Sequence, residues 1–151
     1  MKRLSTLAGK GHGSANIVDR IAVLESRTHV HIVMELMEGG ELFDHIKEDP
    51  YAEPRAAKLV ASHVRTLDFL HAHGIVHRDL RPENILMASS KDDETFKIAD
   101  IGLSNSAKNM RDMLQSKCGT PTNLAPVMLK NLPYDQSVDV WSAGILLYTS
   151  S

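Results

Sequence analysis

The sequence has little cysteine, no long hydrophobic run and no excess of positive charge. Its one cysteine, Cys118, cannot form a disulfide within the chain, which favours an intracellular, cytoplasmic location. The apolar stretch at residues 145–148 is far shorter than the roughly 20 residues that cross a bilayer, and the start of the chain is not a signal peptide. With 17 Lys and Arg against 19 Asp and Glu, the chain has no positive field to attract nucleic acid. We therefore expect no nucleic acid and no membrane as partner.

What is present is the composition of a globular domain. The chain has 151 residues, of which 42% are hydrophobic, and this is enough for one domain with its own core. We find no internal repeat and no low-complexity tract. The locally Gly-rich segment 9–14 fits no phosphate-binding loop pattern and is interpreted as a connector.

Apolar spacing predicts two long helices and a short one. The helix over 54–73 has Pro54 in its first turn and ends before Gly74. The second begins near Ser137, and we expect it to pack against the first with Trp141 mostly buried. A short helix is predicted over 41–47. The predicted apolar faces are Leu42, Phe43 and Ile46 in the short helix, Ala56, Leu59, Val60, His63, Val64, Leu67 and Leu70 in the first long helix, and Val138, Trp141, Ile145 and Tyr148 in the last.

Period-two patterns predict the strands. Residues 29–36 alternate apolar and polar side chains and predict a mostly buried strand. Short apolar segments at 75–76, 85–87 and 96–99, separated by turn-forming residues, predict three small strands. Residues 103–135 contain three prolines and no sustained period, so we expect a long structured loop of a kind that is usually functional.

The chemistry is concentrated in the segment His77-Arg78-Asp79-Leu80-Arg81-Pro82-Glu83-Asn84, followed by Asp100-Ile101-Gly102. A carboxylate can orient a hydroxyl group, and carboxylate and amide oxygens are hard ligands for phosphate-bound metal ions. A cation can offset the charge on a transferred phosphoryl group. The candidates for these roles are Asp79, Asn84, Asp100 and Arg81.

This segment resembles the catalytic loop and the metal-binding loop of eukaryotic protein kinases. Three other segments agree with this resemblance in the same order along the chain: 34–41 resembles a kinase hinge, 119–126 the end of the activation segment, and 139–144 the central helix of the large lobe. The motifs are most similar to those of the calcium/calmodulin-dependent group of Ser/Thr kinases.

The resemblance implies roles for individual residues in a Mg-ATP site. It implies that Asp79 orients the acceptor hydroxyl and that Asn84 and Asp100 hold magnesium, while Arg81 neutralises the transferred phosphoryl group. In the hinge it implies adenine binding by the backbone of Glu35 and Met37, with Met34 as the gatekeeper, Glu41 near the ribose and Leu86 also in the nucleotide site.

The sequence also departs from the kinase pattern. Arg81 stands in place of a lysine and Ile101 in place of a phenylalanine, and both substitutions keep the character of the side chain. Asn123 replaces a tyrosine and Val127 replaces the glutamate of the Ala-Pro-Glu motif, which implies the loss of a buried ion pair.

The resemblance implies an α+β fold, a partial protein kinase fold made mainly of the helical large lobe plus the hinge strands. We expect residues 1–37 to be a remnant of the small lobe and hinge, and residues 38–151 to be part of the large lobe. Most of the small lobe, with its Gly-rich loop and its phosphate-binding lysine, and the last large-lobe helices are expected to be absent. The isolated chain is therefore expected to be a weak or inactive kinase.

Three interpretations of function stay open. The first is a Ser/Thr protein kinase that acts on proteins with basic residues near the acceptor, because of Glu41 and Glu83, and that is activated by phosphorylation at Ser116 beside Arg78. The second is a non-catalytic binding or regulatory module, and the third is an incomplete gene model of a longer kinase. A zinc site at His71, His73 and His77 is disfavoured, because the first two lie at a helix end where solvation is the simpler explanation.

Overall fold

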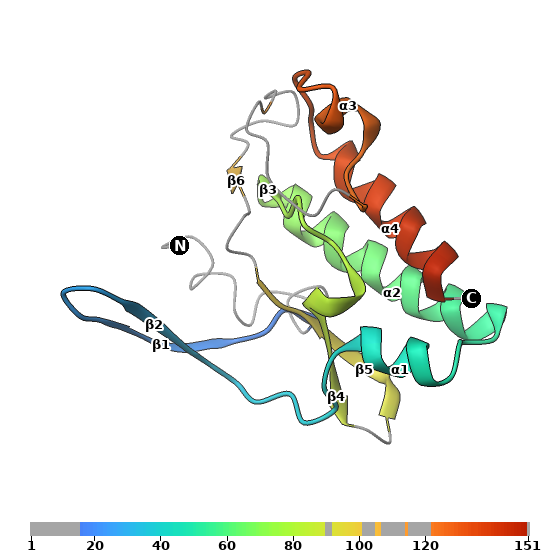
Figure 1. The fold of residues 1–151 in the computed structure, drawn as a ribbon, viewed down its shortest axis with the longest axis horizontal. Coiled ribbons are helices and arrows are strands. Elements are labelled where there is room, and N and C mark those ends of the chain that lie inside the picture. Colours follow the sequence, from blue (N-terminus) through green and yellow to red (C-terminus); the bar gives the residue numbers. More distant parts are fainter. Residues whose placement is uncertain (1–15, 90–91, 101–104, 107–113, 115–121, 151) are drawn as a thin grey trace.

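The computed structural model describes residues 16–89, 92–100, 105–106, 114 and 122–150. Helices and three small antiparallel sheets are mixed in it, which confirms the predicted α+β class. Figure 1 shows a body of helices and short strands from which one long hairpin extends.

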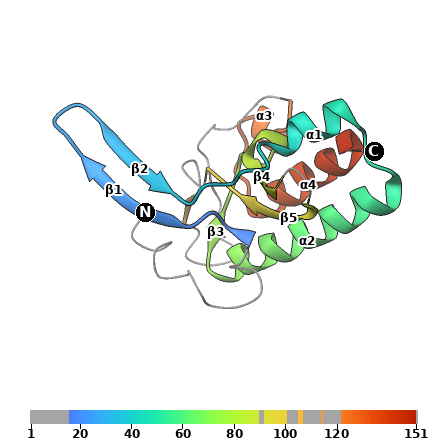
Figure 2. The ribbon, with the colours of Figure 1, turned by 90° about the horizontal axis from the view of Figure 1, so that it is seen from below.

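The hairpin consists of β1 (Arg20–Glu25) and β2 (Val30–Met34), paired antiparallel. The predicted strand is present, but the prediction that it is mostly buried is wrong: every residue of β2 is exposed, with Val30 at 58% and Met34 at 47%. Its only partner among the described residues is β1, so neither face of this two-stranded ribbon is covered. Figure 2 shows the hairpin pointing away from the helices.

The core is built around α2 (Glu53–Ala72), which confirms the predicted long helix. Its backbone leaves the helix through Gly74, whose φ of 70° is a conformation that glycine adopts without strain. The short helix α1 (Leu42–Glu48) contributes Leu42 and Ile46 to the same core, whereas Phe43 is exposed. The buried residues of α2 are Ala56, Leu59, His63, Thr66, Leu67 and Leu70, while Val64 is exposed.

After α2 the described part of the chain forms four short strands that pair in two small antiparallel sheets. β3 (Ile75–Val76) pairs with β6 (Asn105–Ser106), and β4 (Ile85–Ser89) pairs with β5 (Asp92–Ile98). A 3-10 turn, η3 (Pro82–Asn84), enters β4. Met87 of β4 and Phe96 of β5 lie opposite one another and are both buried, so this hairpin is anchored in the core that α2 also lines.

The last helix, α4 (Ser137–Ser150), packs against α2 as predicted, and Figures 1 and 2 both show the two helices side by side. The prediction of its buried face is wrong at Trp141, which is 46% exposed, and at Tyr148, which is 83% exposed. Ala143 and Leu146 of α4 share the core with α2, and Trp141 instead lines a shallow apolar groove with Val140 and Ile145. The residues that α4 buries are Val138, Asp139, Ser142, Ala143, Leu146 and Ser150.

The predicted loop over 103–135 is partly regular. Its described residues include β6 and the short helix α3 (Pro126–Leu129), and Leu114 forms a backbone bridge with Tyr134. Leu114, Met128 and Tyr134 belong to a second buried cluster that also contains Val76 and Val138. In the part of the chain that is described, no helix is long and apolar enough to cross a membrane.

Candidate functional site

The loop after β3 is shaped by one buried carboxylate. Asp139 of α4 has no exposed surface, and its oxygens accept the backbone N–H groups of His77 at 2.9 Å and Arg78 at 2.8 Å. His71 of α2 donates from Nε2 to the same carboxylate at 2.7 Å. These bonds hold Arg78 at a φ of 73°, an uncommon conformation for a residue with a side chain. Asp139 therefore fixes the start of the catalytic loop relative to both long helices.

His77 is the buried link between this loop and the strand that leads to Asp100. Its Nδ1 accepts the backbone N–H of Asp79 at 3.3 Å, so Nε2 carries the proton and donates to the carbonyl of Ala99 at 3.2 Å. Burial lowers the pKa of His77 below its ordinary value, despite the opposing effect of the nearby Asp139 carboxylate. The ring is thus neutral, as these two bonds require.

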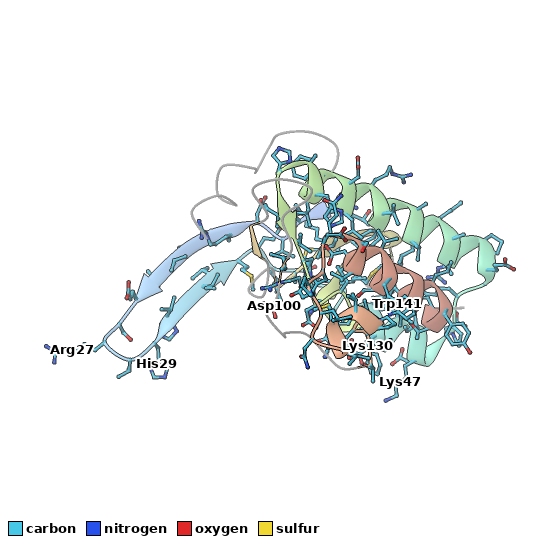
Figure 3. All side chains as sticks on the ribbon, turned by 90° about the horizontal axis from the view of Figure 1, so that it is seen from above. Arg27, His29, Lys47, Asp100, Lys130 and Trp141 are labelled. Atoms are coloured by element: carbon cyan, nitrogen blue, oxygen red, sulfur yellow. The ribbon has the colours of Figure 1, made fainter. Side chains whose placement is uncertain are left out.

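Asp79, Asn84 and Asp100 are brought together by short hydrogen bonds. The side-chain amide of Asn84 donates to the backbone oxygen of Asp79 at 2.8 Å and to its carboxylate at 3.2 Å. The carbonyl of Asn84 accepts the N–H of Ala99 at 2.8 Å, which places the next residue, Asp100, beside the loop. Asp100 is exposed and has a φ of 51°. Figure 3 places it near the base of the hairpin, where the hairpin joins the helical body.

This donor set suits magnesium. With its nitrogen committed to Asp79, Asn84 offers an amide oxygen, and Asp100 offers an exposed carboxylate. Magnesium is commonly held by one or two such protein oxygens, together with phosphate oxygens and water. Among the described residues no group of three or more His, Cys, Asp or Glu could hold a metal, so a site made only of these side chains is not present in that part of the chain.

Arg81 is directed to a neighbour within its own loop. Its Nη2 lies 2.9 Å from Oε1 of Glu83, and both side chains are about one-third exposed, at 28% and 30%. The cation predicted to neutralise a phosphoryl group is therefore engaged with the glutamate that was assigned to substrate recognition.

The hinge runs beside β4 and is fastened to it by backbone bonds. Gly39 donates to the carbonyl of Met87 at 3.0 Å, and Met87 donates to the carbonyl of Gly40 at 2.9 Å. Glu41 forms a backbone bridge with Leu86, so two residues assigned to the nucleotide site are adjacent. Met37 is half-buried between these contacts and β2, while Met34 lies on the exposed hairpin.

Glu35 begins the hinge with a carboxylate that has two partners. Its Oε1 lies 2.6 Å from Nζ of Lys97 on β5 and accepts the backbone N–H of Asp19 at 2.6 Å. Burial raises the pKa of Glu35, but the hydrogen bonds from Lys97 and Asp19 outweigh it, and the net pKa lies below the ordinary value. The carboxylate is therefore ionised near neutral pH.

Several predictions fall on residues outside the described part of the chain. These are the substitution at Ile101, the proposed phosphorylation site at Ser116 and the segment Gly119 to Pro121. Asn123 is described, and its side chain donates to the carbonyl of Leu80 at 3.2 Å, which ties the segment before α3 to the catalytic loop.

Sequence reasoning missed three positioning groups: Asp139, His71 and Lys97. Asp139 was recognised only as part of a motif, although a single acid among apolar residues of a helix signals a buried partner. His71 was expected to be solvated, and this is wrong, because its side chain is only 9% exposed and is bonded to Asp139. The Lys97 contact joins residues 62 positions apart and has no local signal.

Comparisons with known proteins show the family of the chain. The protein kinase domain family matches residues 5–151. The chain is 43% identical over 136 residues to a calcium/calmodulin-dependent protein kinase type 1 of Macrobrachium nipponense, covering 88% of this chain and 38% of that protein. It is 44% identical over 134 residues to the human calcium/calmodulin-dependent protein kinase type 1B, covering 88% and 38%. A probable myosin light chain kinase of Dictyostelium discoideum is 43% identical over 135 residues, covering 88% and 34%. The chain thus spans little more than a third of the length of these relatives.

Proposed function

Because the chain belongs to the protein kinase family, we propose that it carries the catalytic loop of a Ser/Thr kinase that transfers the γ-phosphoryl group of Mg-ATP to protein hydroxyl groups. The observation that carries the proposal is the hydrogen-bonded group of Asp79, Asn84 and the residue pair Ala99-Asp100. In this group the proposed hydroxyl-orienting carboxylate, Asp79, lies at the same end of the β4–β5 hairpin as the two proposed metal ligands, Asn84 and Asp100.

The residues divide the work of the transfer. Asp79 orients the acceptor hydroxyl and accepts its proton, and the hydroxyl oxygen attacks the γ-phosphorus while the bond to the β-phosphate oxygen breaks and ADP leaves. Asn84 holds Asp79 through its amide nitrogen and offers its oxygen to magnesium, as Asp100 does with its carboxylate. Bound magnesium neutralises charge on the phosphate oxygens. The hinge from Glu35 to Glu41 is the place for adenine and ribose.

The acceptor protein is proposed to have basic residues near the phosphorylated Ser or Thr. Glu41, just before α1, is exposed, and Glu83, in the turn η3, is about one-third exposed. Since Arg81 already neutralises part of the charge of Glu83, Glu41 is the stronger determinant. A peptide array should show a preference for Arg or Lys, and a preference for acidic peptides would contradict the assignment.

The test of the nucleotide site is its dependence on magnesium. We expect the chain to bind Mg-ATP more tightly than metal-free ATP, and Asp100→Ala to remove this difference, as measured by calorimetry. Asp44→Ala removes an exposed aspartate of α1 and is the matched control. Affinity that is the same with and without magnesium, and unchanged in Asp100→Ala, would refute the site.

Transfer itself is tested with Mg-ATP, a basic peptide and the Asp79→Asn variant. We expect these 151 residues alone to transfer phosphate slowly, because they contain no Gly-rich phosphate loop of the kinase type and positioning supplies most of the rate. Turnover of about 1–100 s⁻¹, abolished by Asp79→Asn, would contradict the expected weakness. Binding of Mg-ATP with no transfer would favour a non-catalytic nucleotide-binding module.

A further inference from the structure

Three segments far apart in the sequence meet at the side chain of Glu35. Its carboxylate joins the hinge to Lys97 of β5 and to the backbone of Asp19 at the entry to β1, each at 2.6 Å. The backbone N–H of Glu35 in turn donates to the carbonyl of Asp19 at 3.0 Å. The side chains of Lys97 and Glu35 are only 21% and 27% exposed, so water screens their pairing less than it screens a surface pair.

The hinge is held at two points, which we call its anchors. The first anchor is the set of bonds made by the carboxylate of Glu35. The other anchor is the backbone exchange of Gly39 and Gly40 with Met87. Residues 36–38 lie between the two anchors, and no other hydrogen bond to the described residues holds them. Loss of the first anchor would leave this short segment fastened at one end only.

Lys97 also connects the hinge to the metal-binding end of the site. It lies on β5, whose continuation through Ala99 is bonded to Asn84 and leads to Asp100. The Glu35–Lys97 pair therefore sets the position of the hinge relative to the strand that delivers the metal ligand.

We propose that Glu35 and Lys97 are positioning residues that hold the hinge backbone in the geometry that binds adenine. This inference rests on the proposed nucleotide site. Neither side chain needs to touch the base, because the pair acts through the backbone of residues 35–37. The proposal distinguishes these residues from Asp79, Asn84 and Asp100, which act on the phosphates and the hydroxyl group.

The first test separates base binding from phosphate binding. We expect Lys97→Met, which keeps a chain of similar length and removes the charge, to weaken Mg-ATP binding about fivefold, near the upper end for a partly exposed pair. Binding of Mg-GTP, whose base presents a different hydrogen-bonding edge, should change little. Lys97→Arg should restore the affinity for Mg-ATP, and Lys130→Met, at an exposed lysine after α3, should leave it unchanged. Equal weakening of both nucleotides by Lys97→Met would overturn the proposal.

The second test needs no nucleotide. Hydrogen exchange should become about fivefold faster in Lys97→Met for the amide of Glu35, which is bonded to the carbonyl of Asp19, while the amides of α2 keep their protection. Unchanged exchange in the hinge, or faster exchange throughout α2, would overturn the positioning role. If the unaltered chain binds neither nucleotide, the proposed function fails, but the exchange result still decides whether the pair holds the hinge.

Discussion

His63 is expected to make the stability of the chain depend strongly on pH. It lies on the inner face of α2 with no exposed surface, and its ring is 5.9 Å from the ring of Phe96. Neither ring nitrogen has a hydrogen-bond partner among the described residues. Burial, with a further contribution from the charge of His77, lowers the pKa of His63 to about 3, against an ordinary value of 6.5.

The sign and size of the effect follow from proton linkage. Because the folded chain resists protonation of His63 while the unfolded chain does not, the stability is fully present above pH 6.5 and is lost as the pH falls toward 3. At about 1.4 kcal/mol for each pH unit below 6.5, lowering the pH from 7 to 5 costs about 2 kcal/mol through His63 alone. His77, whose pKa is also lowered, adds a loss of the same sign.

The perturbation is His63→Leu, which fills a similar volume and has no nitrogen to protonate. At pH 7 it should stabilise the chain by about 1–3 kcal/mol, because two unpaired buried nitrogens are removed. The difference in free energy of unfolding between His63→Leu and the unaltered chain should be larger at pH 5 than at pH 7 by about 2 kcal/mol. Because both chains contain His77, the difference between their free energies of unfolding at each pH does not include its contribution.

The assay is urea unfolding followed by circular dichroism at pH 7.5, 6 and 5, with the fluorescence of Trp141, the one tryptophan, as a second probe. His31→Leu is the control, since it removes an exposed imidazole of the hairpin where His63→Leu removes a buried one. If the stabilities of the unaltered chain and of His63→Leu fall in parallel with pH, the reasoning about His63 is refuted.

Two further substitutions test how the site is held. Asp139→Ala leaves the backbone N–H groups of His77 and Arg78 without their buried acceptor, so chemical unfolding should show a loss of about 3–5 kcal/mol, and a loss below 1 kcal/mol would contradict its role. Gly39→Ala would place a Cβ 2.7 Å from the backbone oxygen of Met87, which cannot move aside, so it should lower the melting temperature and the affinity for Mg-ATP. The matched change Gly144→Ala, where a Cβ meets no atom within 4 Å, should lower neither the melting temperature nor the affinity for Mg-ATP.

Sequence patterns predicted where helices and strands lie better than they predicted which faces of those elements are buried. The helices over 53–72 and 137–150 were predicted to within a residue or so at their ends, because apolar spacing, Pro54 and Gly74 act locally. Burial of β2 could not be predicted in the same way. Alternation shows that a strand has an apolar face but does not say whether another layer covers it, and here β1 is its only described partner.

The error at Trp141 has a related cause. α4 is apolar on nearly every side, so its sequence does not indicate which face meets α2. The face that meets α2 is instead marked by Asp139, which is bonded to His71, and by Ala143 and Leu146, which share a buried cluster with α2, whereas the Trp141 ring is left outside. Within the site, the motif located Asp79, Asn84 and Asp100, but the bonds that hold them depend on Asp139 and His77, which come from separate elements.

The bond from His77 to Asp139 also sets the order in which the loop can form. It joins residues 62 positions apart, so the first turn of the predicted catalytic loop is closed by a helix that is synthesised after it. A growing chain that has emerged only as far as β5 already contains Asp79 and Asn84, but the acceptor for the neighbouring amides has not yet been made. Closing so long a loop carries an entropic cost that local turns do not. The α2 helix and the β4–β5 hairpin can therefore form before α4 is made, whereas the loop acquires the geometry seen in the structure only after α4 has left the ribosome.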